Sequence, residues 1–238
     1  MHSKSFQDDI VKKTVPIVYQ DESLCIVNKP FGIPVQGGAE ISVSLIEILS
    51  RQLGTQIFPV HRLDKETAGL LVTAKTAEAA HICRQLFESR RIEKEYLAFC
   101  FGGFSNKAEA GHTAGRHHPE YNINTPIIEK GIAKPALTSY RLIGGSEKYS
   151  LFSVRIQTGR MHQIRIHLAG SGYPIIGDDR HGDFKRNKEL WKTARIKKLQ
   201  LCAYRLCFPI KGKKQLFEIE LPSHIHAAIA SLCPHLCI

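Results

Sequence analysis

The sequence predicts an α+β fold, with a mixed, largely antiparallel central sheet and flanking helices. Strand patterns outnumber helix patterns, and they follow one another in runs. A strict strand–helix alternation is missing, which disfavours a doubly wound parallel sheet. The 238 residues, 43% apolar and 23% charged, have the composition of a globular domain with a sizeable core. We expect a polar lead-in over residues 1–15 and one domain over 16–238.

Turn and cap signals delimit the elements of the first hundred residues. Thr76 is a plausible N-cap for a helix that buries a stripe of Ala79, Ile82, Cys83 and Leu86. The remaining elements are short runs bounded by Gly, Pro and polar turns. They are predicted strands at 16–19, 24–28, 58–60, 70–74 and 96–101, a Pro- and Gly-rich loop at 29–38, and a helix at 42–53.

The second half begins with an irregular excursion at 102–135, rich in Gly, His, Asn and Pro. A strand is then predicted at 149–157, where Phe152, Val154 and Ile156 alternate with polar residues. A helix at 161–169 would turn Met161, Ile164 and Leu168 inward. Phe217, Ile219 and Leu221 mark a last strand, and Pro222 and Ser223 begin a C-terminal helix.

Charge and cysteine usage limit the possible partners and compartment. Lys and Arg outnumber Asp and Glu by 33 to 22, a net charge of +11, which favours a nucleic acid first and an anionic membrane surface second. The seven cysteines form no CxxC pair and lie mostly in apolar runs, as buried thiols of a reducing compartment do. A membrane span and a signal peptide are both missing. We therefore expect a cytoplasmic protein.

Asp64 is the first candidate for chemistry. It lies in HRLDKETAG, between two apolar strands, where a carboxylate is costly to bury unless it is paired. Arg62 and the distant Arg165 are possible partners. A purely structural ion pair is the alternative, and the residues alone leave it open.

Two basic segments are further candidates. In QTGRMHQIRIHL (157–168), cations stand where a helix begins, although the helix dipole disfavours them there. A bound anion or a facing carboxylate would explain them, and an exposed basic turn is the alternative. The run 185–198 holds seven cations and one acid near Trp191, which suits phosphate contacts or a merely solvated face.

The twelve histidines raise the question of a metal. The close pairs, His117-His118 and His224-x-His226, have no carboxylate or thiol at ligand spacing. HExxH, P-loop and dinucleotide-binding motifs are missing as well. We expect no metal and no cofactor. A third alternative is a metal-dependent hydrolase, which chelators would inhibit. No sequence motif supports this alternative.

These segments together resemble the RluA family of pseudouridine synthases over about residues 16–222. HRLDKETAGLLV (61–72) resembles the signature that carries the family's catalytic aspartate. Four further segments match in the family's order: YQDESLCIVNKPFGIPVQ (19–36), RRIEKEYLAF (90–99), TGRMHQIRIHL (158–168) and PIIGDDRHG (174–182). Several matches in one order make chance a poor explanation.

The resemblance implies an enzyme that isomerises a uridine of tRNA or rRNA to pseudouridine, on a mixed sheet with an RNA-binding cleft. Asp64 would be the catalytic carboxylate, Tyr96 would lie against the target base, and Arg165 would pair with Asp64. Arg62 would fill the stack left by the flipped nucleotide. We also expect RNA contacts from His61, Lys94, Arg160, Gln163 and Lys29, and a monomeric enzyme.

Two departures from the family pattern bear on the target. The first motif begins near residue 16, so we expect no N-terminal S4-type domain. His181 stands where tyrosine is usual, and HGDFKRN (181–187) is more similar to the small tRNA-modifying branch that acts at uridine 65. A catalytically silent RNA-binding protein on the same fold is the alternative function. It would bind RNA without isomerising it.

Overall fold

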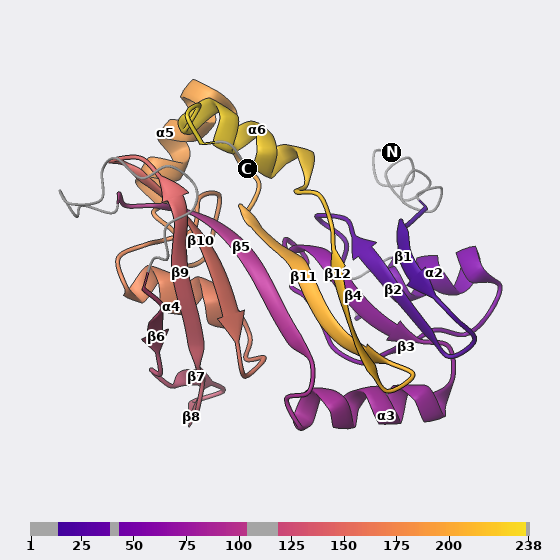
Figure 1. The fold of residues 1–238 in the computed structure, drawn as a ribbon. Coiled ribbons are helices and arrows are strands. Elements are labelled where there is room, and N and C mark those ends of the chain that lie inside the picture. The colour runs from indigo at the N-terminus through magenta and orange to yellow at the C-terminus, as the bar shows by residue number, and fades with distance from the viewer. Residues whose placement is uncertain (1–13, 39–42, 104–118, 237–238) are drawn as a thin grey trace. The chain divides into compact units, whose positions relative to one another are not determined.

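The computed structural model describes residues 14–38, 43–103 and 119–236. The chain forms two compact units, which are described separately (Figure 1). The first comprises residues 1–93 and 203–219, and the second comprises 94–202 and 220–238. The polar lead-in therefore lies almost wholly outside the described residues. Among the described residues, no helix is long and apolar enough to cross a membrane.

The first unit is a sheet with strand order β1-β2-β4-β11-β12, and β3 pairs with β4. Antiparallel pairing joins β2 to β4, from Leu24 opposite Ala74 to Lys29 opposite Gly69. β11 belongs to this unit from Ala203 onward. The strands are β1 (Ile17–Gln20), β2 (Leu24–Lys29), β3 (Phe58–Pro59), β4 (Ala68–Ala74), β11 (Leu201–Ile210) and β12 (Lys213–Glu218).

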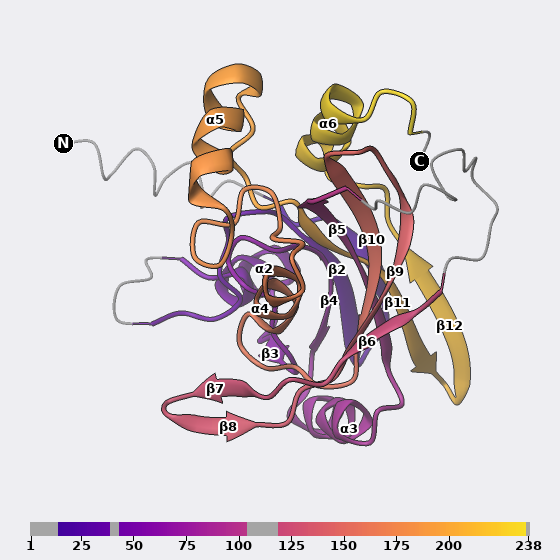
Figure 2. The same cartoon turned by 90° about the vertical axis from the view of Figure 1, so that its left-hand side faces the viewer.

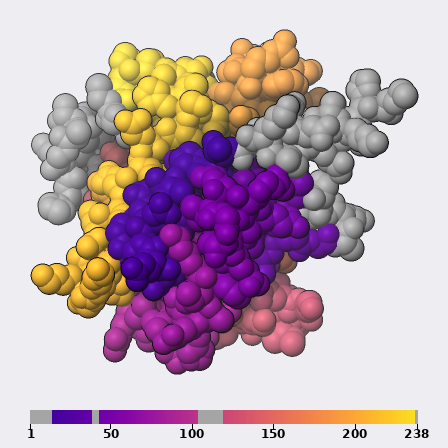
Figure 3. Space-filling view, turned by 90° about the vertical axis from the view of Figure 1, so that its right-hand side faces the viewer, coloured from indigo at the N-terminus to yellow at the C-terminus, as the bar shows by residue number. Residues whose placement is uncertain are grey.

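Strand β4 is buried at every position, so both faces of the sheet are covered there. Its core neighbours include Ile26 of β2 and Leu206 and Phe208 of β11. At Gly69 (φ +116°) a Cβ would lie 2.2 Å from the carbonyl oxygen of Ala203, so this close approach of β4 and β11 requires glycine. Figure 3 shows the face of the unit formed by its indigo and purple N-terminal residues.

The two helices of the first unit that the structure describes begin at side-chain caps. Helix α2 (Leu45–Leu53) starts after Ser44, which forms a capping box with Glu47. The start predicted at residue 42 lies outside the described residues. Helix α3 (Ala77–Glu88) starts after Thr76, whose hydroxyl accepts from the Ala79 amide, as predicted. The prediction of a buried Ile82 is wrong: it is 48% exposed, because the buried face of α3 is centred on Ala80 and Cys83.

The second unit contains the antiparallel sheet β5-β10-β9-β6 and a separate hairpin, β7–β8. Strands β5 and β10 carry bulky apolar residues on both faces, and Leu151, Phe152 and Val154 of β10 are fully buried. The strands are β5 (Glu93–Phe101), β6 (Tyr121–Ile123), β7 (Ile127–Glu129), β8 (Ile132–Lys134), β9 (Thr138–Gly145) and β10 (Tyr149–Ile156). The fold class, α+β on a largely antiparallel sheet, is confirmed.

Two predictions for this unit are corrected. The described part of the excursion at 102–135 is not irregular, since it holds β6, β7 and β8, each too short to show a sequence period. The alternation of Phe152, Val154 and Ile156 with polar residues predicts a solvated polar face for β10, but Ser153 on that face is 2% exposed because this part of the strand is covered on both sides.

The described part of the second unit also contains three helices (Figure 2): α4 (Gln163–Gly170), α5 (Phe184–Ala194) and α6 (Ser223–Leu232). Helix α6 begins after Pro222, as predicted. The predicted start of α4 at residue 161 is wrong, because His162 is left-handed (φ 54°, ψ 22°) and caps the helix. Met161 therefore lies outside the helix and is 57% exposed instead of inward.

Candidate functional site

The segment that carries Asp64 is a short loop between β3 and β4 in the first unit. Leu63, 6% exposed, anchors the loop in the core, and Thr67, 2% exposed, donates its amide to the Asp64 carbonyl at 3.1 Å. Arg62 is exposed and Asp64 is partly exposed. The expectation of a buried carboxylate is therefore corrected: Asp64 is a partly exposed residue.

Lys29 holds this loop in place through hydrogen bonds from its buried ammonium. It is 0% exposed, and its ammonium donates to the carbonyl oxygens of Pro30 (3.0 Å), Ile33 (2.8 Å) and Lys65 (3.1 Å). The amide of Gly32 also donates to Lys65, at 2.9 Å. The residue after Asp64 is thus tied to the 29–38 loop. The fully buried ammonium therefore has a structural role in this loop, and the RNA contact predicted for Lys29 stays a prediction.

His61 fixes the other end of the loop. Its Nε2 accepts a 3.0 Å hydrogen bond from the Val72 amide, and its ring centroid lies 4.4 Å from that of Phe87 in α3. The ring thereby connects the loop to β4 and α3. This contact positions the segment, and the RNA contact predicted for His61 stays a prediction.

In the second unit, Arg165 is the largest fully buried side chain, at 1% exposed. Its Nε and Nη2 donate to the two oxygens of Asp178, at 2.8 and 2.6 Å. Burial alone would raise the pKa of Asp178, but Arg165 and the amides of His181 and Arg180 together lower it. A bidentate, charge-assisted pair of this kind fixes the plane of the guanidinium.

Gln163 shapes the turn before α4. It is 2% exposed, and its Oε1 accepts from the Thr158 hydroxyl (2.7 Å) and the Arg160 amide (3.1 Å). Its Nε2 donates to the Leu137 carbonyl and the Thr138 hydroxyl, at 3.0 Å each. The side chain is buried and engaged in shaping this turn, and the RNA contact predicted for Gln163 stays a prediction. Arg160 remains partly exposed and donates to the Pro135 carbonyl at 3.2 Å.

Strand β5 carries the Lys94–Tyr96 motif. Tyr96 is 4% exposed. Desolvation lowers the pKa of the Lys94 ammonium to about 8, although part of its side chain is exposed. Between them, Glu95 is buried and accepts from the Ser153 hydroxyl, with Arg155 and Arg141 at 3.5 and 3.6 Å.

The catalytic residues predicted from the sequence are divided between the two units. Asp64, with Arg62 and His61, belongs to the first unit, and Tyr96 and Arg165, with Lys94, belong to the second. The Asp64–Arg165 pair therefore stays a prediction. Sequence reasoning missed the role of Asp178, although the motif PIIGDDRHG contained it.

His181, which stands where tyrosine is usual in the family pattern, contacts the cap of α4. Its Nε2 lies 2.9 Å from Nδ1 of His162, with the two rings at 69°. One ring donates and the other accepts, depending on the tautomer. The polar atom of residue 181 thus supports the left-handed residue at which α4 begins.

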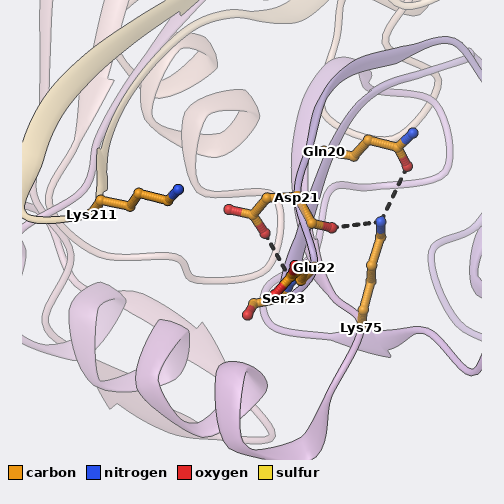
Figure 4. Close-up of a pocket in the computed structure, with 6 residues that line it drawn as sticks. All are labelled: Gln20, Asp21, Glu22, Ser23, Lys75 and Lys211. Atoms are coloured by element: carbon orange, nitrogen blue, oxygen red, sulfur yellow. Dashed lines mark hydrogen bonds between the residues drawn. The ribbon is translucent and has the colours of Figure 1, made fainter.

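An open polar pocket of about 590 Å³ lies elsewhere in the first unit, beside the β1–β2 turn (Figure 4). Lys75 there donates to the Asp21 carbonyl, and Asp21 accepts from the amides of Ser23 and Leu24. These bonds hold the turn together and point to no ligand. Within residues 14–38, 43–103 and 119–236, no three or more His, Cys, Asp or Glu residues are grouped as metal ligands.

Comparison with known proteins identifies similar sequences over most of the chain. Residues 23–170 match the family model described as RNA pseudouridylate synthase. An uncharacterized RNA pseudouridine synthase of Aquifex aeolicus is 35% identical over 95% of this chain and 76% of that protein. The tRNA pseudouridine synthase C of Haemophilus ducreyi is 32% identical, over 81% and 84% of the two chains.

Two further comparisons extend this result. The ribosomal large subunit pseudouridine synthase D of Pasteurella multocida is 31% identical over 91% of this chain and 70% of that protein. The solved structure of human RNA Pseudouridylate Synthase Domain Containing 4 has the same fold, with a TM-score of 0.72, 24% identity, and coverage of 96% and 95%.

Proposed function

We propose that Asp64 is the catalytic carboxylate of this chain, which belongs to the RluA family of RNA pseudouridine synthases. Enzymes of this family isomerise uridine in RNA. One observation carries the proposal. Asp64 stands partly exposed on a loop held at both ends, by His61 through Val72 and by Lys29 through Lys65. A reacting group needs such a rigid support and an accessible position.

The reaction requires only a carboxylate and proton transfers. The bond from C1′ to N1 breaks, the base turns, and a bond from C1′ to C5 forms. The proton on C5 leaves, and N1 gains one, so neither an oxidant nor an external atom is consumed. Asp64 can act as a nucleophile at C1′ or as a base on the C2′ proton. Both routes use the ionised carboxylate.

Other residues would prepare the substrate. The target uridine has to leave its stack, and Arg62, exposed beside Asp64, would occupy the vacated space. Tyr96 would lie against the flipped base, and Arg165, fixed by Asp178, would pair with Asp64. Lys94 and Arg160 would contact phosphates. The net charge of +11 supports this grip on RNA. We place the enzyme in the cytoplasm as a monomer.

The target that we propose is a tRNA. The tRNA pseudouridine synthase C of Haemophilus ducreyi, 32% identical over 81% of this chain, supports a tRNA target. The HGDFKRN segment (181–187) also favours the small tRNA-modifying branch.

Mapping pseudouridine at nucleotide resolution in unmodified tRNA and large-subunit rRNA transcripts tests the target. We expect a new pseudouridine in a tRNA and none in the rRNA. Modification of rRNA alone would overturn the tRNA proposal. Tight binding without new pseudouridine in either pool would favour the silent RNA-binding alternative.

A further inference from the structure

Helix α5 presents an exposed face in which aromatic and basic side chains alternate. Phe184 is 61% exposed and Trp191 43%, and Lys188 and Arg195 are exposed as well. Phe184, Lys188 and Trp191 are spaced by four and three positions, so they lie along one side of the helix, and Arg195 follows as its left-handed C-cap. Lys192 and Lys197, also exposed, flank this row. We refer to these six residues as the α5 face.

The core does not account for these aromatic rings. Leu190 is the buried residue of α5, and it lies about 100° around the helix from Trp191. Cations instead surround Trp191: the Arg195 guanidinium lies 5.2 Å from a ring centroid, and the Lys197 ammonium lies 5.8 Å away. An exposed indole among cations combines a stacking surface with positive charge. Unpaired nucleotides, with a flat base and a phosphate, complement both.

The face is also rigidly mounted, although α5 stands out from the rest of its unit (Figure 2). The Asn187 side chain accepts from the Gly177 amide at 2.8 Å and donates to the Asp178 carbonyl at 2.9 Å. Arg186 stacks on Phe101, 4.1 Å from its centroid. The helix is therefore tied to the loop that holds Arg165, so binding on α5 would not require the helix to become ordered first.

We propose that the α5 face is a second RNA-contact surface, which binds an unpaired segment of the substrate outside the reacting nucleotide. One base stacks on Trp191, and Lys188, Lys192, Arg195 and Lys197 contact phosphates around it. This inference rests on the RNA substrate of the proposed function. It assigns to α5 a contribution to affinity and none to the chemical step.

Trp191 provides a direct probe, because it is the sole tryptophan of the chain. Titration with a single-stranded oligouridylate should quench its fluorescence in a saturable way. A duplex RNA of the same length should quench it less, because paired bases are not free to stack. Equal quenching by duplex and single strand would contradict the stacking contact.

Variants separate stacking from charge. Trp191→Ala should raise the Kd for tRNA transcript about 5- to 100-fold, while Trp191→Phe should recover most of the loss. The triple variant Lys192→Gln/Arg195→Gln/Lys197→Gln removes three phosphate contacts. Each contact contributes about 0.7 to the slope of log Kd against log salt concentration, so this slope should fall by about 2. The matched control, Arg84→Gln/Arg91→Gln/Lys213→Gln, removes three exposed cations of the first unit and should change neither quantity.

Turnover distinguishes this inference from the proposed function. At saturating RNA, Trp191→Ala should retain the wild-type kcat and show a raised KM. If the α5 variants match the control triple in Kd, KM and salt slope while the wild type is active, the α5 proposal fails alone. If the wild type makes no pseudouridine, the proposed function fails, and the binding and quenching results still decide the role of α5.

Discussion

At the scale of single residues, Arg165 and Asp178 form an almost fully buried ion pair in the second unit. Asp178→Asn leaves an almost fully buried guanidinium without its compensating charge. We expect the free energy of unfolding to fall by about 3–5 kcal/mol, measured by chemical denaturation. Asp179→Asn is the matched control, because Asp179 lies 3.6 Å from Arg165 but its side chain is 79% exposed. Equal small losses in both variants would contradict the assignment.

The same pair predicts how stability depends on acid. The pKa of Asp178 is lowered in the folded chain, so its contribution is fully present above the ordinary carboxyl pKa of about 3.9. The contribution is lost as pH falls through the lower pKa of the folded state, because the Asp178 carboxyl is then protonated in the folded chain as well as in the unfolded chain. Melting temperatures of wild type and Asp178→Asn should therefore converge toward low pH.

Lys94 predicts a second pH dependence, in the alkaline range. Because desolvation lowers its pKa to about 8, the ammonium is lost as pH rises through that value. If Lys94 contacts phosphate, wild-type affinity for tRNA transcript should weaken between about pH 7 and pH 9. Lys94→Arg keeps its charge and should bind with a flat profile, and Lys94→Gln should bind weakly throughout. The prediction fails if Lys94→Gln binds as the wild type does.

At the scale of elements, the buried ammonium of Lys29 connects two loops. Lys29→Met would leave the Pro30 and Ile33 carbonyls without this donor, while the Lys65 carbonyl would keep the Gly32 amide, and each unsatisfied buried group costs about 1–3 kcal/mol. We expect a large drop in melting temperature and a lower kcat, since Asp64 precedes Lys65. The exposed neighbour gives the control: Lys65→Met removes a surface ammonium and should leave the melting temperature nearly unchanged.

Local sequence signals were enough to predict elements whose ends have side-chain caps or long apolar runs. Thr76 begins α3 and Pro222 precedes α6 as predicted, because a cap or a proline acts on its immediate neighbours. The start of α4 was not predictable in this way. It depends on a left-handed His162 and on a Gln163 side chain that reaches Leu137, far along the chain.

In the candidate site, too, features set by neighbouring residues could be predicted and features set by distant contacts could not. Sequence motifs identified Asp64, Tyr96 and Arg165 as candidates, because such motifs are short and can be read from neighbouring residues. The structural roles of Lys29 and Gln163 were missed, because a lysine or glutamine in a loop carries no local sign of burial. Their partners lie up to 36 residues away in the chain, and only the folded structure brings them into contact.

At the scale of the whole molecule, the chain divides the predicted catalytic set between two compact units. It passes from the first unit to the second between Glu93 and Lys94 and returns at Ala203. The carboxylate belongs to the first unit, and the tyrosine and arginine belong to the second. The fold class followed from the order of strand patterns, because that order reports the layer architecture even when individual strands are too short to recognise.

The central claim is that Asp64 performs the chemistry on RNA. The most direct measurement is tritium release from tRNA transcripts labelled at C5 of uridine, because forming the C1′–C5 bond frees that hydrogen. Asp64→Asn should abolish release while its Kd for the transcript stays within about twofold of wild type. Glu66→Gln, which removes a neighbouring carboxylate, should release tritium at the wild-type rate. Release by Asp64→Asn at the wild-type rate would contradict the assignment.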